Sequence, residues 1–324
     1  MKYFNSKELW LKQLSNTVNN PNELLNLLKL NNNIKLVNNI KTKVSFPFRV
    51  PKIFVKRMKL NDPNDPLLMQ VLVNIKESRN FNKLTKKISF ESNLIKFNLI
   101  HKYNNRVLIL LNNSCAIHCR YCFRRDYLKD INNVKSNINY IIDYILQNKE
   151  INEVILSGGD PLMIRDKNIK IFISMLEKIN HILILRIHTR LPVIIPSRIT
   201  DNLCNILSNS RFKIILVTHI NHANEIDSSV INSMNKLSKA NVILLNQSVL
   251  LRNINNNANV LAHLSIKLIQ AGIVPYYIHL LDKINSNIHF LVTKTQANKI
   301  MKDLSSKVSG YLLPKLMYDK KHYK

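Results

Sequence analysis

From about Leu108 onward, short β-branched apolar runs alternate with segments whose apolar residues recur at helical spacing. The apolar runs are Val107–Leu111, Val154–Leu156, Ile182–Ile187, Lys213–Thr218, Val242–Val249 and Val274–Leu281. The helical candidates are Ile138–Asn148, Lys167–Ile179, Arg198–Ser208, Ser228–Lys239, Asn259–Ala271 and Ala297–Val308. Continuous apolar strands separated by amphipathic helices predict a parallel sheet that is covered on its outside. We therefore expect an α/β fold, a partial (βα)6 parallel barrel, with a doubly wound open sheet as the alternative.

The first hundred residues have a different pattern. They predict three helices, Ser6–Val18, Pro21–Leu28 and Asp65–Ile75, joined by polar loops that contain proline. We interpret residues 1–100 as a helical N-terminal extension, 101–300 as the barrel and 301–324 as a short C-terminal segment.

Composition and charge narrow the class of protein. Hydrophobic residues make up 46% of the 324 residues, which is typical of a globular chain. The formal net charge of +28 is compatible with a nucleic-acid or membrane-surface binder, but the basic residues are dispersed and form no block. We therefore expect no specific nucleic-acid binding. The N-terminus has no apolar leader pattern and no apolar run has the length of a bilayer span, so we expect a cytoplasmic protein.

Three of the four cysteines, Cys115, Cys119 and Cys122, follow the first predicted strand with the spacing C-x3-C-x2-C. Three thiolates on one loop can hold three irons of a cubane cluster and leave the fourth iron open. The amino and carboxylate groups of S-adenosylmethionine can bind that iron, and one electron then releases a 5′-deoxyadenosyl radical. Structural zinc on Cys119, Cys122 and His118 is an alternative, as is a set of inert buried thiols. The fourth cysteine, Cys204, is expected to pack in the core.

Polar side chains also follow or occupy the other predicted strands, as expected of a barrel enzyme. Gly158 and Gly159 form a turn or allow a ligand to approach the backbone closely. Arg124 is either a solvated charge or a clamp for a carboxylate or phosphate. We assign no proton-transfer role to the histidines at the strand ends. The strand-end residues are Ser157 to Pro161, His188 to Arg190, His219 to His222, Asn246 to Ser248, and Asp282.

Together these segments resemble the lysine 2,3-aminomutases, most closely the branch that supplies β-lysine for modification of elongation factor P. The resemblance runs from about Asn22 to Asp319. It implies a radical S-adenosylmethionine type of partial barrel. The carrying segments are His101 to Arg106, Cys115 to Arg125, Ser157 to Met163, Leu185 to Arg190, His219 to Glu225, Leu245 to Val249, Pro275 to Tyr277 through Asp282, and Gly310 with Tyr311.

The resemblance implies an isomerase that converts L-lysine to β-lysine with a [4Fe-4S] cluster, S-adenosylmethionine and pyridoxal phosphate. By the same resemblance, Arg124 holds the substrate carboxylate, and Asp282 and Asp319 hold the distal ammonium. The segment Gly158, Gly159 and Asp160 cradles S-adenosylmethionine. The positions around pyridoxal phosphate are Tyr103, Arg106 and Gln247.

The resemblance also implies a lysine that anchors pyridoxal phosphate seven residues beyond Asp319, at position 326. The sequence ends at Lys324, which is the nearest candidate. Two other functions stay open: a radical S-adenosylmethionine protein without pyridoxal phosphate, and a basic binding protein with a structural metal site. The partners implied are an electron donor such as flavodoxin or ferredoxin, an indirect link to elongation factor P and its ligase, and a second copy of the chain.

Overall fold

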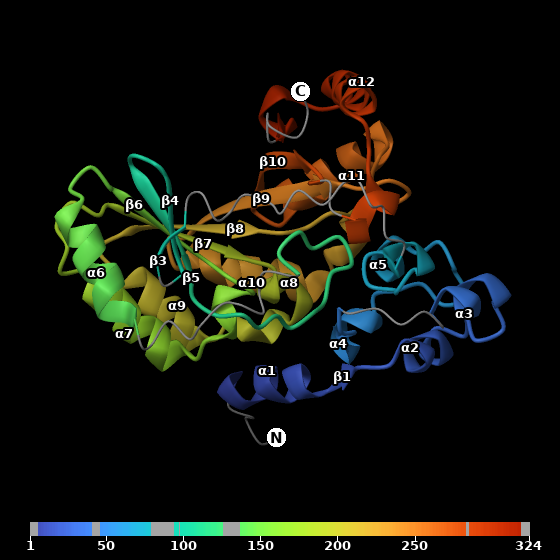
Figure 1. Ribbon diagram of the computed structural model, residues 1–324, viewed down its shortest axis with the longest axis horizontal. Helices are drawn as coiled ribbons and strands as arrows, with labels where there is room; N and C mark the ends of the chain where they lie inside the picture. Colours follow the sequence, from blue (N-terminus) through green and yellow to red (C-terminus); the bar gives the residue numbers. More distant parts are fainter. Residues whose placement is uncertain are drawn as a thin grey trace.

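The computed structural model describes residues 6–40, 46–78, 94–96, 98–125, 137–282 and 285–318. A nine-stranded sheet forms the centre of the molecule, and its spatial order follows the chain from β3 to β11 (Figure 1). The strands are β3 (Leu94–Lys96), β4 (Leu99–Tyr103), β5 (Arg106–Leu110), β6 (Glu153–Ser157), β7 (Ile184–Thr189), β8 (Lys213–Thr218), β9 (Ile243–Leu250), β10 (Val274–Leu280) and β11 (Lys315–Met317).

Strands β5 to β11 run parallel, whereas β3, β4 and β5 pair antiparallel. Among the described residues, the edge strands β3 and β11 do not pair with each other, so the sheet stays open and forms no closed barrel. This confirms the predicted partial barrel, and all six predicted parallel strands are present with boundaries that differ by at most two residues.

Helices follow the parallel strands and cover the outside of the sheet (Figure 1). Side chains cap the first turns of three of them: Thr200 is the N-cap of α9, Asp227 that of α10, and Thr293 that of α12, where it forms a capping box with Gln296. The helices are α6 (Ile138–Gln147), α7 (Asp166–Leu176), α8 (Leu191–Ile194), α9 (Asp201–Ser208), α10 (Ser228–Lys239), α11 (Ala258–Gln270) and α12 (Lys294–Ser305).

Alternation along each strand separates a helix-facing side from an inner side, which we call the lumen. In β7, Leu185 and Ile187 are buried in the main hydrophobic core together with residues of the covering helices. The intervening Arg186 and His188 are less buried and belong to the opposite, lumen side. In β7 the lumen side therefore carries the polar side chains.

The N-terminal extension contains α1 (Ser6–Ser15), α2 (Pro21–Leu27), α3 (Ile34–Ile40), α4 (Lys52–Val55) and α5 (Pro66–Met69), and a small sheet of β1 (Thr17–Val18) and β2 (Val50–Pro51). The predicted helix Asp65–Ile75 is wrong beyond its first turn. The carbonyl of Gln70 accepts a hydrogen bond from the Arg120 N–H instead of continuing the helix. In addition, β3 and the first two residues of β4 extend the sheet before residue 101, while the domain boundaries themselves stay a prediction.

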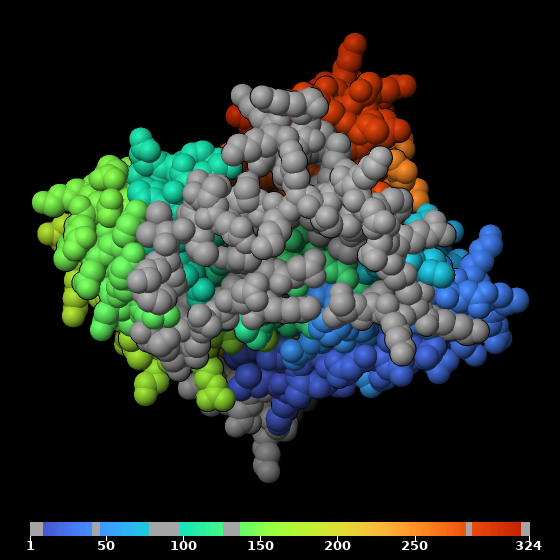
Figure 2. All heavy atoms as spheres, in the orientation of Figure 1, coloured from blue at the N-terminus to red at the C-terminus, as the bar shows by residue number. Residues whose placement is uncertain are grey.

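The two ends of the chain cover different parts of the molecule. In the face shown in Figure 2, side chains of the N-terminal extension and of the C-terminal segment lie in separate areas, blue and red. Among the described residues we find no helix with the length and hydrophobicity of a bilayer span.

Candidate active site

The cysteine loop begins directly after β5 and carries Cys115, Cys119 and Cys122 at the carboxyl edge of the parallel strands. Two backbone hydrogen bonds fix it to the N-terminal extension: His118 N–H donates to the Arg49 carbonyl, and Arg120 N–H donates to the Gln70 carbonyl. The N-terminal extension therefore packs against one side of the cysteine loop.

The three thiols suit a cluster better than they suit solvent. Burial raises the pKa of Cys115 well above its usual value and raises the pKa of Cys122 to about 11. A buried thiolate needs positive charge nearby, which iron supplies. Within the described ranges, no three His, Cys, Asp or Glu side chains converge as ligands of a single ion. The ligands of a cubane bind separate irons and need not converge on one point.

A buried ion cluster, not foreseen from the sequence, lies behind the cysteine loop. The Glu77 carboxylate accepts from Arg120 Nε at 2.9 Å and from Arg125 Nη1 at 3.0 Å, and Arg120 is fully buried. Three arginines within six residues after a buried strand could have signalled this, because such charges need a carboxylate partner away from water. The partner, however, lies 43 residues before Arg120.

The adjacent glycines Gly158 and Gly159 are required by the cysteine loop itself. A Cβ on Gly158 would lie 2.4 Å from the Asn112 carbonyl oxygen, and Gly158 has a φ of +129°. A Cβ on Gly159 would lie 2.3 Å from the Ser114 carbonyl oxygen. The glycines thus let the loops after β5 and β6 pack backbone to backbone. Contact with S-adenosylmethionine stays a prediction.

Asp160 joins the loop after β6 to the end of β7. One carboxylate oxygen accepts from Leu162 N–H and Thr189 Oγ1, and the other accepts from the N–H groups of Arg190 and Leu191. Burial raises the pKa of Asp160, and these hydrogen bonds act in the opposite direction. The side chain therefore holds the backbone shape of the site.

Arg124 extends from the cysteine loop to the end of β6. Its Nη1 donates to Ser157 Oγ at 2.8 Å and to the Gly158 carbonyl at 3.3 Å, both of which are neutral acceptors. The guanidinium therefore lies between the cysteine loop and the glycine turn, where predicted site residues meet.

Histidines near the carboxyl ends of the inner strands are held neutral. Burial, with Arg186 and Arg124 nearby, lowers the pKa of His188 to about 3. Burial alone lowers the pKa of His279 to about 4. Burial and neighbouring Arg190 place the pKa of His219 well below its usual value. At neutral pH these side chains therefore contribute hydrogen-bonding groups and no charge.

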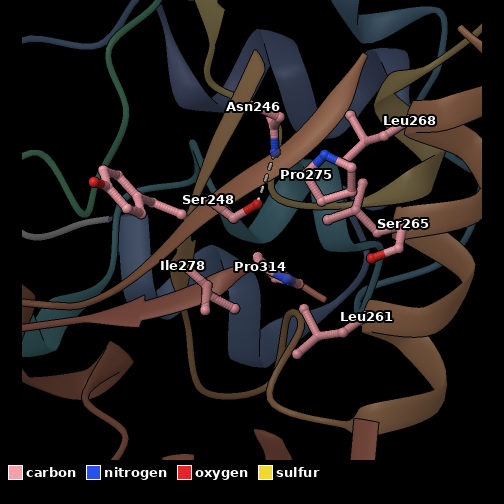
Figure 3. Close-up of a pocket in the computed structure, with 10 residues that line it drawn as sticks. Asn246, Ser248, Leu261, Ser265, Leu268, Pro275, Ile278 and Pro314 are labelled. Atoms are coloured by element: carbon pink, nitrogen blue, oxygen red, sulfur yellow. Dashed lines mark hydrogen bonds between the residues drawn. The ribbon is translucent and has the colours of Figure 1, made fainter. Parts of the chain in front are cut away.

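The polar residues of β9 divide between the two faces of the sheet. Asn246 and Ser248 point toward α11, where Asn246 Nδ2 donates to Ser248 Oγ at 3.0 Å (Figure 3). Both side chains also bind the Ile220 carbonyl, so they stabilise the loop after β8. Gln247, between them, is less buried and belongs to the lumen side by alternation.

Tyr103 and Arg106 pair across the β4–β5 hairpin, with the Arg106 guanidinium 3.9 Å from the Tyr103 ring centroid. They lie at the start of β5, whereas Cys115 follows its end, so the strand separates them by roughly 13 Å or more. A cation stacked on a half-exposed aromatic ring suits an aromatic phosphate such as pyridoxal phosphate. The structure does not bring these two residues to the cluster edge.

Asp282 follows β10 and lies at the same carboxyl edge as the cysteine loop. The other predicted ammonium ligand, Asp319, and the candidate anchor Lys324 lie outside the described residues. Cys204 lies in α9 and packs against the main core, as expected.

Comparisons with known proteins agree with the site. A model of the radical SAM superfamily matches residues 109–257, which include the cysteine loop. The chain is 52% identical over 316 residues to the L-lysine 2,3-aminomutase of Buchnera aphidicola subsp. Baizongia pistaciae, covering 97% of this chain and 93% of the relative. It is 45% identical to the L-lysine 2,3-aminomutase of Escherichia coli K12, covering 96% and 91%.

More distant similarity extends the same picture. The L-lysine 2,3-aminomutase of Clostridium subterminale is 32% identical, over 96% of this chain and 75% of the relative. Among solved structures, a radical SAM methyltransferase from Sphaerobacter thermophilus superposes with a TM-score of 0.51, over 68% of this chain and 69% of that one. At 11% identity this likeness concerns the fold alone.

Proposed function

The chain belongs to the family of L-lysine 2,3-aminomutases, and on that premise we propose that it is an isomerase that converts L-lysine to β-lysine. The observation that carries the proposal is the C-x3-C-x2-C loop at the carboxyl edge of a curved parallel sheet whose lumen is polar. The residues present fit a [4Fe-4S] cluster: three free, half-buried thiols lie on one loop, with a guanidinium against one sulfur.

When bound, the cluster and S-adenosylmethionine supply the 5′-deoxyadenosyl radical, and pyridoxal phosphate supplies the carbonyl that carries the migrating amino group. The protein contributes binding, orientation and exclusion of water. A curved sheet that presents its polar side chains inward can shield a primary radical from solvent. The glycine turn at Gly158 and Gly159 fixes the loop that faces S-adenosylmethionine in this proposal.

We assign each charged end of the substrate lysine to a protein side chain of opposite charge. Arg124 presents a guanidinium beside Ser157, which suits the substrate carboxylate. Asp282, across the carboxyl edge at the end of β10, suits the distal ammonium, with Asp319 as its partner. An ammonium taken from water without a carboxylate costs several kcal/mol, so these acids select lysine over an acidic substrate.

We assign pyridoxal phosphate to the part of the lumen near the start of β5, away from the cysteine loop. Arg106, stacked on Tyr103, offers a cation to its phosphate, and Gln247 offers an amide from β9. The anchoring lysine is proposed in the segment that contains Lys324. Borohydride trapping and peptide mapping would identify it, and a stoichiometric adduct outside residues 315–324 would contradict the assignment.

The decisive experiment is a lysine isomerisation assay on anaerobically reconstituted protein, with and without added pyridoxal phosphate. We expect β-lysine only when iron, S-adenosylmethionine, reductant and pyridoxal phosphate are all present. Asp282→Asn should reduce lysine turnover far more than reductive cleavage of S-adenosylmethionine. Equal turnover of glutamate and lysine by the unmodified protein would contradict the substrate assignment.

We further propose the compartment, the electron donor and the use of the product. A reducing cytoplasm keeps three thiols available for iron, and a low-potential donor such as flavodoxin or ferredoxin would reduce the cluster. The product would serve the β-lysylation of elongation factor P by its ligase. Loss of that modification in cells lacking this protein, with rescue by external β-lysine, is the expected result.

A further inference from the structure

Arg190 connects the cysteine loop to two other parts of the chain. It follows β7, and its side chain is only 7% exposed. Its Nη1 donates to Cys119 Sγ at 2.6 Å and to Tyr121 Oη at 2.7 Å. Its Nη2 donates to Gln70 Oε1 at 2.7 Å and to Glu225 Oε2 at 2.8 Å. One edge of the guanidinium is therefore fixed against a cluster cysteine, while the other edge is held by an amide and a carboxylate.

Tyr121 supplies a second hydrogen bond to the same sulfur. The ring is buried, and its Oη accepts from Arg190 Nη1 and from Asn221 Nδ2, each at 2.7 Å. Since both donors approach the oxygen, the hydroxyl hydrogen remains for Cys119, and a side-chain hydrogen bond joins Tyr121 to Cys119. Cys119 Sγ thus faces one charged donor and one neutral donor.

The supporting residues keep both donors in place. The other Glu225 oxygen accepts from the N–H groups of Asn221 and His222 and from Gln70 Nε2. Asn221 in turn donates to Gln70 Oε1 and accepts from the Val249 N–H. These hydrogen bonds hold both Nη atoms of Arg190 and the Tyr121 hydroxyl, so the two donors meet the sulfur at fixed positions although Arg190 Nε is buried without a partner among the described residues.

We propose that Arg190 and Tyr121 are positioning residues that raise the reduction potential of the cluster through Cys119. One-electron reduction adds a negative charge to the cluster, and hydrogen bonds to its sulfurs stabilise the more negative state. A guanidinium in a water-poor site strengthens that effect. The inference rests on the cluster of the proposed function and deepens it, because the potential decides how readily the electron reaches S-adenosylmethionine.

The test is an anaerobic redox titration of the reconstituted full chain with dithionite, followed by electron paramagnetic resonance. We expect Arg190→Gln to lower the ratio of reduced to oxidised cluster at a fixed potential by about tenfold or more, equivalent to about 59 mV for one electron. Tyr121→Phe keeps the ring and should lower the ratio by about threefold, the value of one neutral hydrogen bond.

Arg198→Gln is the matched control. Arg198 is fully buried and ion-paired to Asp166 at 2.7 Å, and it donates to the carbonyls of Leu162 and Ile164 instead of to a cysteine sulfur. This variant should lose stability and keep the potential of the unmodified protein. Potentials of Arg190→Gln and Tyr121→Phe equal to that of Arg198→Gln, at full iron content, would overturn the inference.

If Arg190→Gln fails to hold iron, Tyr121→Phe decides alone, and an unchanged potential in that variant overturns the inference. If the unmodified protein holds no four-iron cluster by iron content and spectrum, both the proposed function and this inference fail. A cluster with normal cleavage of S-adenosylmethionine but unshifted variants contradicts only the inference.

Discussion

The N-terminal extension and the C-terminal segment both flank the sheet, but they attach to it by different means. The extension shares the main hydrophobic core, with Trp10 and Phe54 in the same cluster as the strands. It also places Glu77 and Gln70 directly behind the cysteine loop. The C-terminal segment packs through a smaller apolar cluster with β10 and α11, centred on residues such as Leu304.

The N-terminal extension, and not the C-terminal segment, belongs to the site of the cluster. Charges and amides of the extension touch the cysteine loop, so a change there should affect iron binding and stability together. Apolar packing of the C-terminal segment involves β10, which carries His279 on its inner side and Asp282 beyond its end. A change there should alter stability and substrate binding while the cluster remains.

The largest expected effect comes from Glu77→Gln. It removes the carboxylate that pairs with Arg120 and Arg125, and it leaves two buried cations without their partner. We expect a loss of about 3–5 kcal/mol in the free energy of unfolding, with a loss of iron on reconstitution. Urea unfolding and iron analysis measure both. Glu23→Gln, which breaks the exposed pair with Lys52 on the same extension, is the control.

Leu304→Ala tests the other region. Leu304 is fully buried in the C-terminal apolar cluster, so truncation should cost about 2–4 kcal/mol through the cavity it leaves. Iron content and the spectrum of the cluster should stay unchanged, unlike in Glu77→Gln. Tyr311→Ala, at a position 68% exposed, should change neither quantity. Loss of iron in Leu304→Ala would remove the distinction between the two regions.

Acid should lower the stability of the sheet that lies between the two regions. The pKa values of His188 and His279 fall from the usual 6.5 to about 3 and about 4, so folding favours their neutral forms. The unfolded chain then binds more protons, and the stability present above pH 6.5 is lost as the pH falls toward 4. We expect a loss of about 1–2 kcal/mol per histidine between about pH 7 and about pH 5. His279→Gln should flatten this dependence in urea unfolding, and an equally steep dependence would contradict the assignment.

The smallest expected effect is that of Cys204→Ala. This half-buried thiol lies in α9, away from the cysteine loop, so we expect less than about 1 kcal/mol of destabilisation. Iron content should remain complete, whereas Cys115→Ala should lose the cluster. A full four-iron spectrum in Cys115→Ala would contradict the ligand assignment.

The sequence predicted the features that depend on local patterns. The parallel strands follow from period and length, and the cysteine loop follows from spacing, because both signals lie within a few residues. The partners of the loop were missed for the opposite reason. Glu77 is 43 positions from Arg120, and Gln70 is 120 positions from Arg190, so only the fold brings these groups together. The predicted length of the helix at Asp65 was wrong for the same reason, because a hydrogen bond from Arg120, distant in sequence, ends the helix.

The distance in sequence between Gln70 and Glu225 has a consequence for biosynthesis. Their side chains meet although 155 positions separate them. At a translation rate of about 5–20 residues per second, Glu225 is made about 8–30 s after Gln70. During that time the cysteine loop has been synthesised without the network that surrounds it in the finished protein. We therefore expect iron–sulfur assembly on this chain to take place after Glu225 has been made and the network has formed, on a folded apoprotein.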